Sequence, residues 1–166
     1  MREVDVKTAL KRKYPESVVL VITMDKEGKV NFAPICWATN ASRKPRTWVL
    51  AVNKVHRTTK NIRNTKEFVI CFPSEKQIED VSYCGKVSGN EVNKVKKCKF
   101  DLIKSKRIKV PLIENSVACF ECKLFKEIRL PKIDHIIFIG EVLTAYISNE
   151  KKRLFHWGNY KLDIVK

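Results

Sequence analysis

A short basic segment, residues 54–62, carries the side chains best suited to chemistry in this chain. It reads Lys-Val-His-Arg-Thr-Thr-Lys-Asn-Ile, at the point where a strand-like run gives way to a helical pattern. The first N–H groups of a helix have no partner within the helix and carry partial positive charge, so this position suits an anion. Arg57 adds a charged donor, and Thr58 and Thr59 add hydroxyls. The segment therefore predicts a phosphate-binding site.

The same residues also fit a more ordinary structural role. A helix that begins near Thr58 can use this residue as a cap and leave Arg57 as a solvated cation. His56 belongs to the same segment and shares its functional case. The neighbouring elements and motifs must decide between the two interpretations.

Other candidate residues have simpler explanations. Cys119 and Cys122 have the C-x-x-C spacing of redox and zinc motifs, but positions i and i+3 of a strand point to opposite faces. No second cysteine or histidine pair completes a zinc site, so we predict a structural role and no metal. Cys84 fits either a redox thiol or a small buried apolar side chain, and the second is more common. Ordinary hydrogen bonds are expected for His135 and His156.

The composition indicates one folded domain with a strongly basic surface. The chain has 166 residues, 44% of them hydrophobic, and its 34 Lys and Arg against 18 Asp and Glu give a net charge of +16. Such a charge attracts anions of many kinds. The basic residues are scattered, and the lysine-rich run 94–109 lacks interleaved aromatics apart from Phe100, so we interpret it as a solvated face.

Nothing in the sequence indicates export or membrane insertion. Residues 1–13 are polar, and no apolar run approaches the roughly 20 residues needed to cross a bilayer. We therefore expect a soluble cytoplasmic protein. In that compartment reduced thiols are expected for all six cysteines, namely Cys36, Cys71, Cys84, Cys98, Cys119 and Cys122.

The elements around the basic segment are mostly short strands. Apolar and alternating runs predict strands at 17–24, 30–36, 47–53 and 67–72, and two longer ones at 117–128 and 135–147 around a turn at 129–134. Helices are predicted at 58–65, from Ser74 with a Ser74–Gln77 capping box, and at 90–97 with Val92 and Val95 inward. Short connections favour antiparallel neighbours, so we expect a mainly β fold, a closed or nearly closed barrel with short helices.

The order of these motifs resembles the flavin reductase-like family, and in particular its flavoredoxin-like branch. Five segments carry the resemblance over residues 15–147: 18–23 with 28–34; Trp37-Ala38-Thr39-Asn40-Ala41-Ser42 with Pro45; His56-Arg57-Thr58 with Asn61-Ile62 and 67–70; Tyr83-Cys84-Gly85 with Ser88-Gly89 and 92–94; and 111–113 with Glu121-Cys122 and 134–142. No Walker loop, G-x-G-x-x-G or G-x-S-x-G motif competes with this assignment.

The resemblance implies an FMN-binding split barrel, a Greek-key-like antiparallel barrel. It implies a single domain over 1–166, with a core at about 15–147 and a short tail at 148–166. The loop 37–42 would carry the isoalloxazine ring, Trp37 would cover the ring or fill the barrel end, and Gly85 and Gly89 would let the backbone pass close to the ligand. No catalytic side chain is expected, because the flavin carries the chemistry. The implied cofactor-binding residues are Trp37, Ala38, Thr39, Asn40, Ser42, Asn53, His56, Arg57, Thr58, Asn61, Cys84, Gly85 and Ser88.

Several functions stay open at this point. The resemblance implies a homodimeric FMN oxidoreductase, either a reductase that takes hydride from NAD(P)H or a flavoredoxin-like carrier that exchanges electrons with a protein such as ferredoxin. A basic β-barrel that binds nucleic acid is the alternative, motivated by the charge of +16. A flavin-dependent oxidase of the pyridoxamine-oxidase branch is disfavoured by the segment 83–89.

Overall fold

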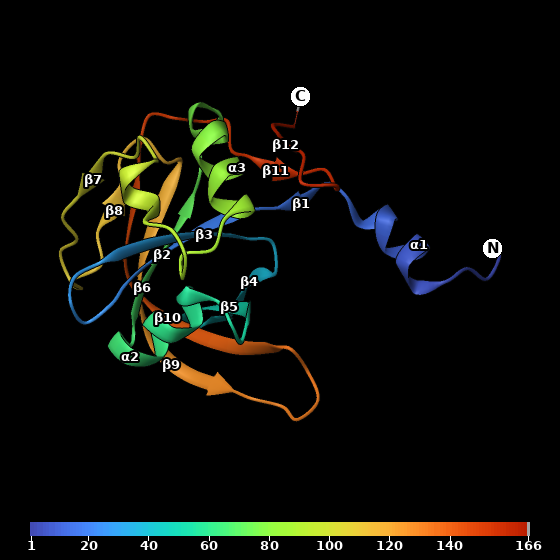
Figure 1. Cartoon of the computed structure of the whole chain (residues 1–166), viewed down its shortest axis with the longest axis horizontal. Helices are drawn as coiled ribbons and strands as arrows, with labels where there is room; N and C mark the ends of the chain where they lie inside the picture. Colours follow the sequence, from blue (N-terminus) through green and yellow to red (C-terminus); the bar gives the residue numbers. More distant parts are fainter. Residues whose placement is uncertain (166) are drawn as a thin grey trace.

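The structure, a computed structural model, describes residues 1–165, and a curved antiparallel sheet of seven strands lies at its centre (Figure 1). The strands are β2 (Val19–Met24), β3 (Val30–Ile35), β4 (Ala38–Arg43), β5 (Arg46–Asn53), β6 (Glu67–Phe72), β9 (Ala118–Ile128) and β10 (His135–Ile147). Their order is β3-β2-β6-β9-β10-β5-β4, so the two edge strands are consecutive in the sequence. The barrel therefore stays open between β3 and β4.

Short elements surround this sheet. The helices are α1 (Val6–Leu10), α2 (Arg57–Thr65) and α3 (Ile78–Lys86), and the 3-10 turns are η1 (Lys11–Lys13), η2 (Glu75–Gln77) and η3 (Lys94–Lys96). Two small sheets join β1 (Glu16–Ser17) to β11 (Phe155–His156) and β12 (Leu162–Asp163), and β7 (Leu102–Ile103) to β8 (Leu112–Ile113). Helix α1 projects away from the barrel (Figure 1), and none of its residues is buried.

Both faces of the central strands are covered, which explains why β2 is apolar throughout. Val19 and Val21 point into the barrel and pack with Phe68 and Phe138. Leu20 and Ile22 face outward into a second core that α3 and the segment around residues 108–113 cover. Because successive side chains of a strand alternate between faces, a strand buried on both sides needs an unbroken apolar run.

The two-core arrangement also separates the cysteines of the C-x-x-C pair. Cys119 lies in the outer core and Cys122 in the barrel interior, as predicted.

The prediction that all six thiols are reduced differs from the structure, in which Cys71 and Cys119 form a disulfide. These residues lie opposite each other on β6 and β9, with 4.2 Å between their Cα atoms, and this cross-strand position brings the sulfurs together.

The strand predictions are confirmed for β2, β3, β5, β6, β9 and β10 to within two residues at each end. The capping box is also confirmed, since Gln77 Oε1 accepts the Ser74 N–H at 2.9 Å. The loop predicted at 37–42 is instead mostly the edge strand β4. The helix predicted at 90–97 is wrong, because only the 3-10 turn η3 forms there and Val95 is exposed.

None of the helices within residues 1–165 is long and apolar enough to cross a membrane.

Gly140 on β10 provides a direct test of the barrel packing. A Cβ at this position would lie 2.2 Å from Cζ of Phe68, whose side chain is fully buried. Gly140→Ala should therefore lower the free energy of unfolding by about 1–3 kcal/mol, measured by denaturant unfolding. In a Phe68→Leu background the same substitution should cost less, because the ring atoms are gone. Equal costs in both backgrounds would show that Phe68 is not the obstacle.

Candidate functional site

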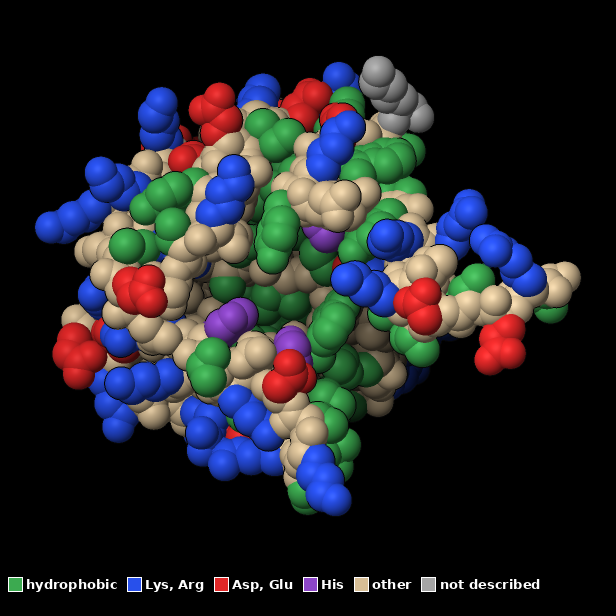
Figure 2. Space-filling model, turned by 45° about the vertical axis from the view of Figure 1, so that its right-hand side comes forward, with side chains coloured by type: hydrophobic (Ala, Val, Ile, Leu, Met, Phe, Trp, Pro, Cys, Tyr) green, Lys and Arg blue, Asp and Glu red, His purple; other side chains and the backbone are tan. Residues whose placement is uncertain are grey.

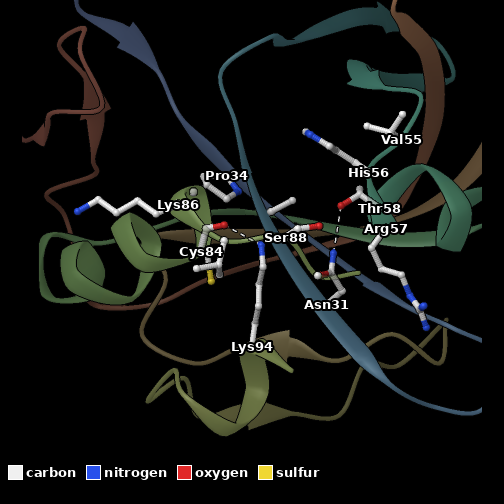
Figure 3. A pocket seen from close by; sticks show the side chains of 14 residues that line it. Asn31, Pro34, Val55, His56, Arg57, Thr58, Cys84, Lys86, Ser88 and Lys94 are labelled. Carbon is white, nitrogen blue, oxygen red and sulfur yellow. Dashed lines mark hydrogen bonds between the residues drawn. The ribbon is translucent and has the colours of Figure 1, made fainter. Parts of the chain in front are cut away.

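A cavity of about 370 Å³ lies where the N-terminus of α2 meets β3 and the segment from α3 to η3 (Figure 3). Its walls come from three stretches that are far apart in the sequence. The lining residues are Asn31, Ala33, Pro34, Val55, His56, Arg57, Thr58, Cys84, Gly85, Lys86, Val87, Ser88, Gly89 and Lys94. The fold thus brings the basic segment next to the predicted segment 84–88.

The N-terminus of α2 opens onto this cavity without a side-chain cap. His56 occupies the N-cap position in an extended conformation and makes no capping hydrogen bond with its side chain. The first N–H groups of the helix are therefore left for a ligand or water. Thr58 is buried, and its hydroxyl accepts a hydrogen bond from the Asn31 side chain at 3.1 Å. Thr59 secures the turn by donating to the Asn53 carbonyl at 2.7 Å.

Arg57 lines the cavity but is already paired. Its guanidinium forms an ion pair with Asp25 in the turn between β2 and β3, and in Figure 3 it points away from Lys94. Burial of the Asp25 carboxyl raises its pKa, but the Lys29 N–H and the Arg57 guanidinium outweigh this effect, so the pKa is lowered overall. Asp25 is therefore ionised, and its carboxylate holds the Arg57 guanidinium at one end of the cavity.

Lys94 supplies a buried cation on the opposite wall. Its side chain is only 5% exposed, and its Nζ donates to the carbonyl oxygen of Phe32 at 2.9 Å. It also donates to the carbonyl oxygen of Cys84 at 2.7 Å (Figure 3). None of the salt bridges found within residues 1–165 includes this ammonium. Burial lowers its pKa, since a charge away from water is costly. An ammonium without a carboxylate partner in a cavity wall attracts an anionic ligand.

The interpretation of Lys94 as part of a solvated face is therefore wrong. The other basic residues of the run 94–109 are exposed, as expected. Lysine is rarely buried in proteins, so nothing in the sequence distinguished Lys94 from the exposed lysines that follow it. Asn31 was likewise missed as a site residue, because its role depends on the meeting of β3 with α2.

Gly89 allows two walls of the cavity to approach closely. A Cβ there would lie 2.0 Å from Oδ1 of Asn31 and 3.3 Å from Cβ of Arg57. At Gly85 a Cβ would lie 3.3 Å from Cγ of Pro34, which is tight but less severe. Because Gly89 has no side chain, the Asn31 side chain can occupy the space beside it and reach Thr58 at the N-terminus of α2.

A second cavity, of about 180 Å³, continues from the first at the open side of the barrel. It shares Pro34 and His56 with the first cavity and is also lined by Ile35, Cys36, Trp37, Ala51, Val52, Asn53 and His135. Figure 2 shows this face as a hollow with an apolar floor, histidines at its rim and lysines and arginines around it. The two cavities differ in charge: Arg57, Lys86 and Lys94 line the first, whereas the described residues place no lysine or arginine in the lining of the second.

Trp37 lies at the mouth of this second cavity. Its side chain is 54% exposed, and its ring centroid lies 4.8 Å from that of His135. Packing inside the barrel end, one of the two predicted roles, is therefore excluded. Nδ1 of His135 is also hydrogen-bonded to Oδ1 of Asp134, at 2.7 Å, which is the ordinary role expected for this histidine.

The remaining predicted site residues lie outside both cavities. Asn61 is fully buried, and its amide donates to the Thr23 hydroxyl at 3.1 Å, which makes it part of the helix–barrel contact. Four others belong to the edge strand β4, where they are exposed or partly exposed: Ala38, Thr39, Asn40 and Ser42. The structure brings together Trp37, Asn53, His56, Arg57, Thr58, Cys84, Gly85 and Ser88.

Two side chains in the first cavity are held in their neutral forms. Burial raises the pKa of the Cys84 thiol, which lies 3.4 Å from Sγ of Cys98, so Cys84 is a poor nucleophile. Burial lowers the pKa of His56, and the nearby charges of Lys94 and His135 act in the same direction. The cavity therefore offers cations and hydrogen-bond donors rather than a catalytic nucleophile, which suits binding of an anionic group.

The curved antiparallel sheet, open between its consecutive edge strands, is a split barrel, and the first cavity lies at the N-terminus of α2. The FMN-binding protein of Thermus thermophilus has the same fold, with a TM-score of 0.86 and 22% identity over 99% of this chain and 95% of that one. A flavoredoxin from Methanosarcina acetivorans superimposes with a TM-score of 0.85 and 23% identity, over 100% of this chain and 91% of that one.

The profile of the flavin reductase like domain matches residues 11–162. The chain therefore belongs to the flavin reductase-like family, as the motifs predicted. An uncharacterized protein of Archaeoglobus fulgidus is 32% identical over 130 residues, which cover 78% of this chain and 71% of that protein. Membership of this family supports a flavin-related oxidoreductase function.

The pairing of Asp25 with Arg57 predicts an acid-sensitive element of stability. Because the folded-state pKa of Asp25 lies below its ordinary value of 3.8, the contribution is fully present above that pH and is lost as the pH falls through the folded pKa. Asp25→Asn should lower the free energy of unfolding at neutral pH by about 1–3 kcal/mol and make its fall below about pH 4 shallower.

Denaturant unfolding across a pH series measures both effects. Glu27→Gln, in the same turn but exposed, is the matched control and should leave the curve close to that of the wild type. Parallel acid profiles for wild type and Asp25→Asn would contradict the assignment.

Proposed function

We propose that this chain binds FMN, with the phosphate in the first cavity and the isoalloxazine ring toward the second. The observation that carries the proposal is the lining of the first cavity: an uncapped helix N-terminus and the buried Lys94 ammonium face one space. Thr58 and Ser88 add hydroxyl groups to the same walls. A phosphate monoester would satisfy these donors together.

The second cavity fits the other end of the same ligand. It joins the first cavity through Pro34 and His56, and its walls include apolar side chains of β3 and β5. Trp37 and Asn53 supply an aromatic face and an amide at its mouth. A planar aromatic ring needs such an apolar slot with a few polar groups at its edge. The family membership supports the choice of a flavin over other phosphorylated ligands.

The reaction we propose is oxidoreduction, either as a flavin reductase or as an electron carrier. Bound FMN supplies the hydride and electron chemistry, so the side chains need only bind and orient it. The exposed position of Trp37 leaves the mouth of the second cavity accessible to a partner from solvent. We therefore favour a reductase that takes hydride from NAD(P)H. A homodimer also stays a prediction.

Arg57→Ala should weaken FMN binding by about 1–3 kcal/mol, the usual value of a hydrogen bond to a charged group. The loss of the cation also leaves Asp25 unpaired beside the phosphate, which acts in the same direction. Titration of flavin fluorescence with protein measures the affinity.

Arg63→Ala is the matched control, because Arg63 lies on the same helix but lines neither of the two joined cavities. It removes the same charge from the protein. Equal affinities of the two variants for FMN would remove Arg57 from the phosphate site.

The electron donor can be identified in an anaerobic stopped-flow experiment on the FMN-loaded protein. We expect NADH or NADPH to bleach the flavin absorbance within seconds, because the open cavity mouth admits the nicotinamide. Failure of both nucleotides, combined with rapid bleaching by reduced ferredoxin, would contradict the reductase proposal and favour the carrier. A protein that takes up no FMN but binds oligonucleotides in a salt-dependent manner would instead support the nucleic-acid alternative.

A further inference from the structure

Three potential metal ligands from distant parts of the chain meet beside the open edge of the barrel. Glu16 on β1 is directly opposite His156 on β11, and Cys36 follows the end of β3. The ligand atoms that these residues offer, a carboxylate oxygen, an imidazole nitrogen and a thiol sulfur, all lie within 4.8 Å of one another. All three side chains are partly buried.

The His156 ring provides independent evidence for a missing partner. Its Nδ1 atom is buried and has no hydrogen-bond partner within residues 1–165. The ring packs edge-to-face against Tyr14, with 5.1 Å between the ring centroids. Leaving such a buried nitrogen without a hydrogen-bond partner is energetically costly. The ordinary hydrogen bonds expected for His156 are thus incomplete at this atom.

The donor set selects the class of ion. A thiolate and an imidazole are ligands of borderline and soft metals, whereas Mg²⁺ and Ca²⁺ take oxygen ligands. Zinc binds the combination of sulfur, nitrogen and carboxylate oxygen, usually with tetrahedral geometry, and three protein ligands leave one position for water. We propose that Glu16, Cys36 and His156 form a binding site for Zn²⁺ or a closely similar divalent cation.

Binding would require two local changes. The Cys36 thiol must release its proton, because the thiolate is the ligand. The Glu16 carboxylate must exchange its ion pair with Lys13 for the metal. Lys13 belongs to the N-terminal arm, residues 1–17, which precedes the barrel. Its side chain is 34% exposed, so its ammonium can move into solvent.

The site would tie both ends of the chain to the barrel. Glu16 belongs to the N-terminal arm and His156 to the C-terminal segment, and β1 and β11 are only two residues long each. Cys36 also lines the second cavity, next to Trp37. A metal here would therefore stabilise the two short strands and the position of Cys36 at the cavity mouth.

Cobalt and zinc titrations of the chelator-treated full chain test this proposal. Difference spectra against the same sample before cobalt addition remove any flavin absorbance, and we expect a near-ultraviolet thiolate-to-cobalt charge-transfer band. Zinc should raise the melting temperature. Cys36→Ser should abolish the band, while Glu16→Gln and His156→Asn should weaken zinc affinity by more than about tenfold.

Cys98→Ser is the matched control, because Cys98 is a partly buried free thiol elsewhere in the structure. It should retain the cobalt band and the zinc affinity. Absence of the band in the folded wild type, its persistence in Cys36→Ser, or its loss in Cys98→Ser would overturn the proposal. The last result would place the metal on the Cys84–Cys98 pair. If Cys36→Ser does not fold, the Glu16→Gln variant provides the test: an unchanged affinity for zinc would overturn the proposal.

Discussion

The buried Lys94 ammonium is the interaction on which the candidate site depends. Its hydrogen bonds to the carbonyls of Phe32 and Cys84 join η3 to both β3 and α3. Those three elements, with the N-terminus of α2, are the walls of the first cavity. A buried cation is costly unless its hydrogen bonds are satisfied, so the site is stable only while these segments stay together. The same cation gives the cavity its preference for an anion.

The open edge of the barrel explains why the cavities lie where they do. The sheet order ends at β3 and β4, and these strands are joined by the short segment of Cys36 and Trp37. The Trp37 carbonyl accepts a hydrogen bond from the Ala51 N–H at 2.9 Å, which links this segment to β5. The second cavity occupies the resulting gap. The interior of the barrel is filled by side chains from both of its halves, so the space for a ligand lies at this opening rather than inside the barrel.

The predictable part of the structure is the part governed by local rules. Alternation and apolar runs located the main strands, and the capping box at Ser74 marked the start of a helix. The composition of residues 54–62 indicated a helix N-terminus suited to an anion, but not that His56 would be its N-cap without a side-chain hydrogen bond. The role of Lys94 was not predictable, because only the packing of η3 against β3 buries it. The disulfide between Cys71 and Cys119 likewise depends on the register of β6 against β9.

The same distinction between local pattern and packing applies to the candidate site residues. Residues 56–58 and 84–88 were found because their types and order resemble a family motif, and the fold then brought them together. Asn61 matched the motif equally well, yet its amide points to Thr23 inside the molecule. Sequence spacing places a residue on an element, but the packing of that element decides which way its side chain faces.

The proposed function rests on recognition of a phosphate group by the first cavity. The most direct measurement compares the affinities of the protein for FMN and for riboflavin, which differ only in that group, at constant ionic strength. We expect FMN to bind more than about tenfold tighter than riboflavin, because riboflavin cannot make the charge-assisted hydrogen bonds of the phosphate. Equal affinities for FMN and riboflavin would contradict it.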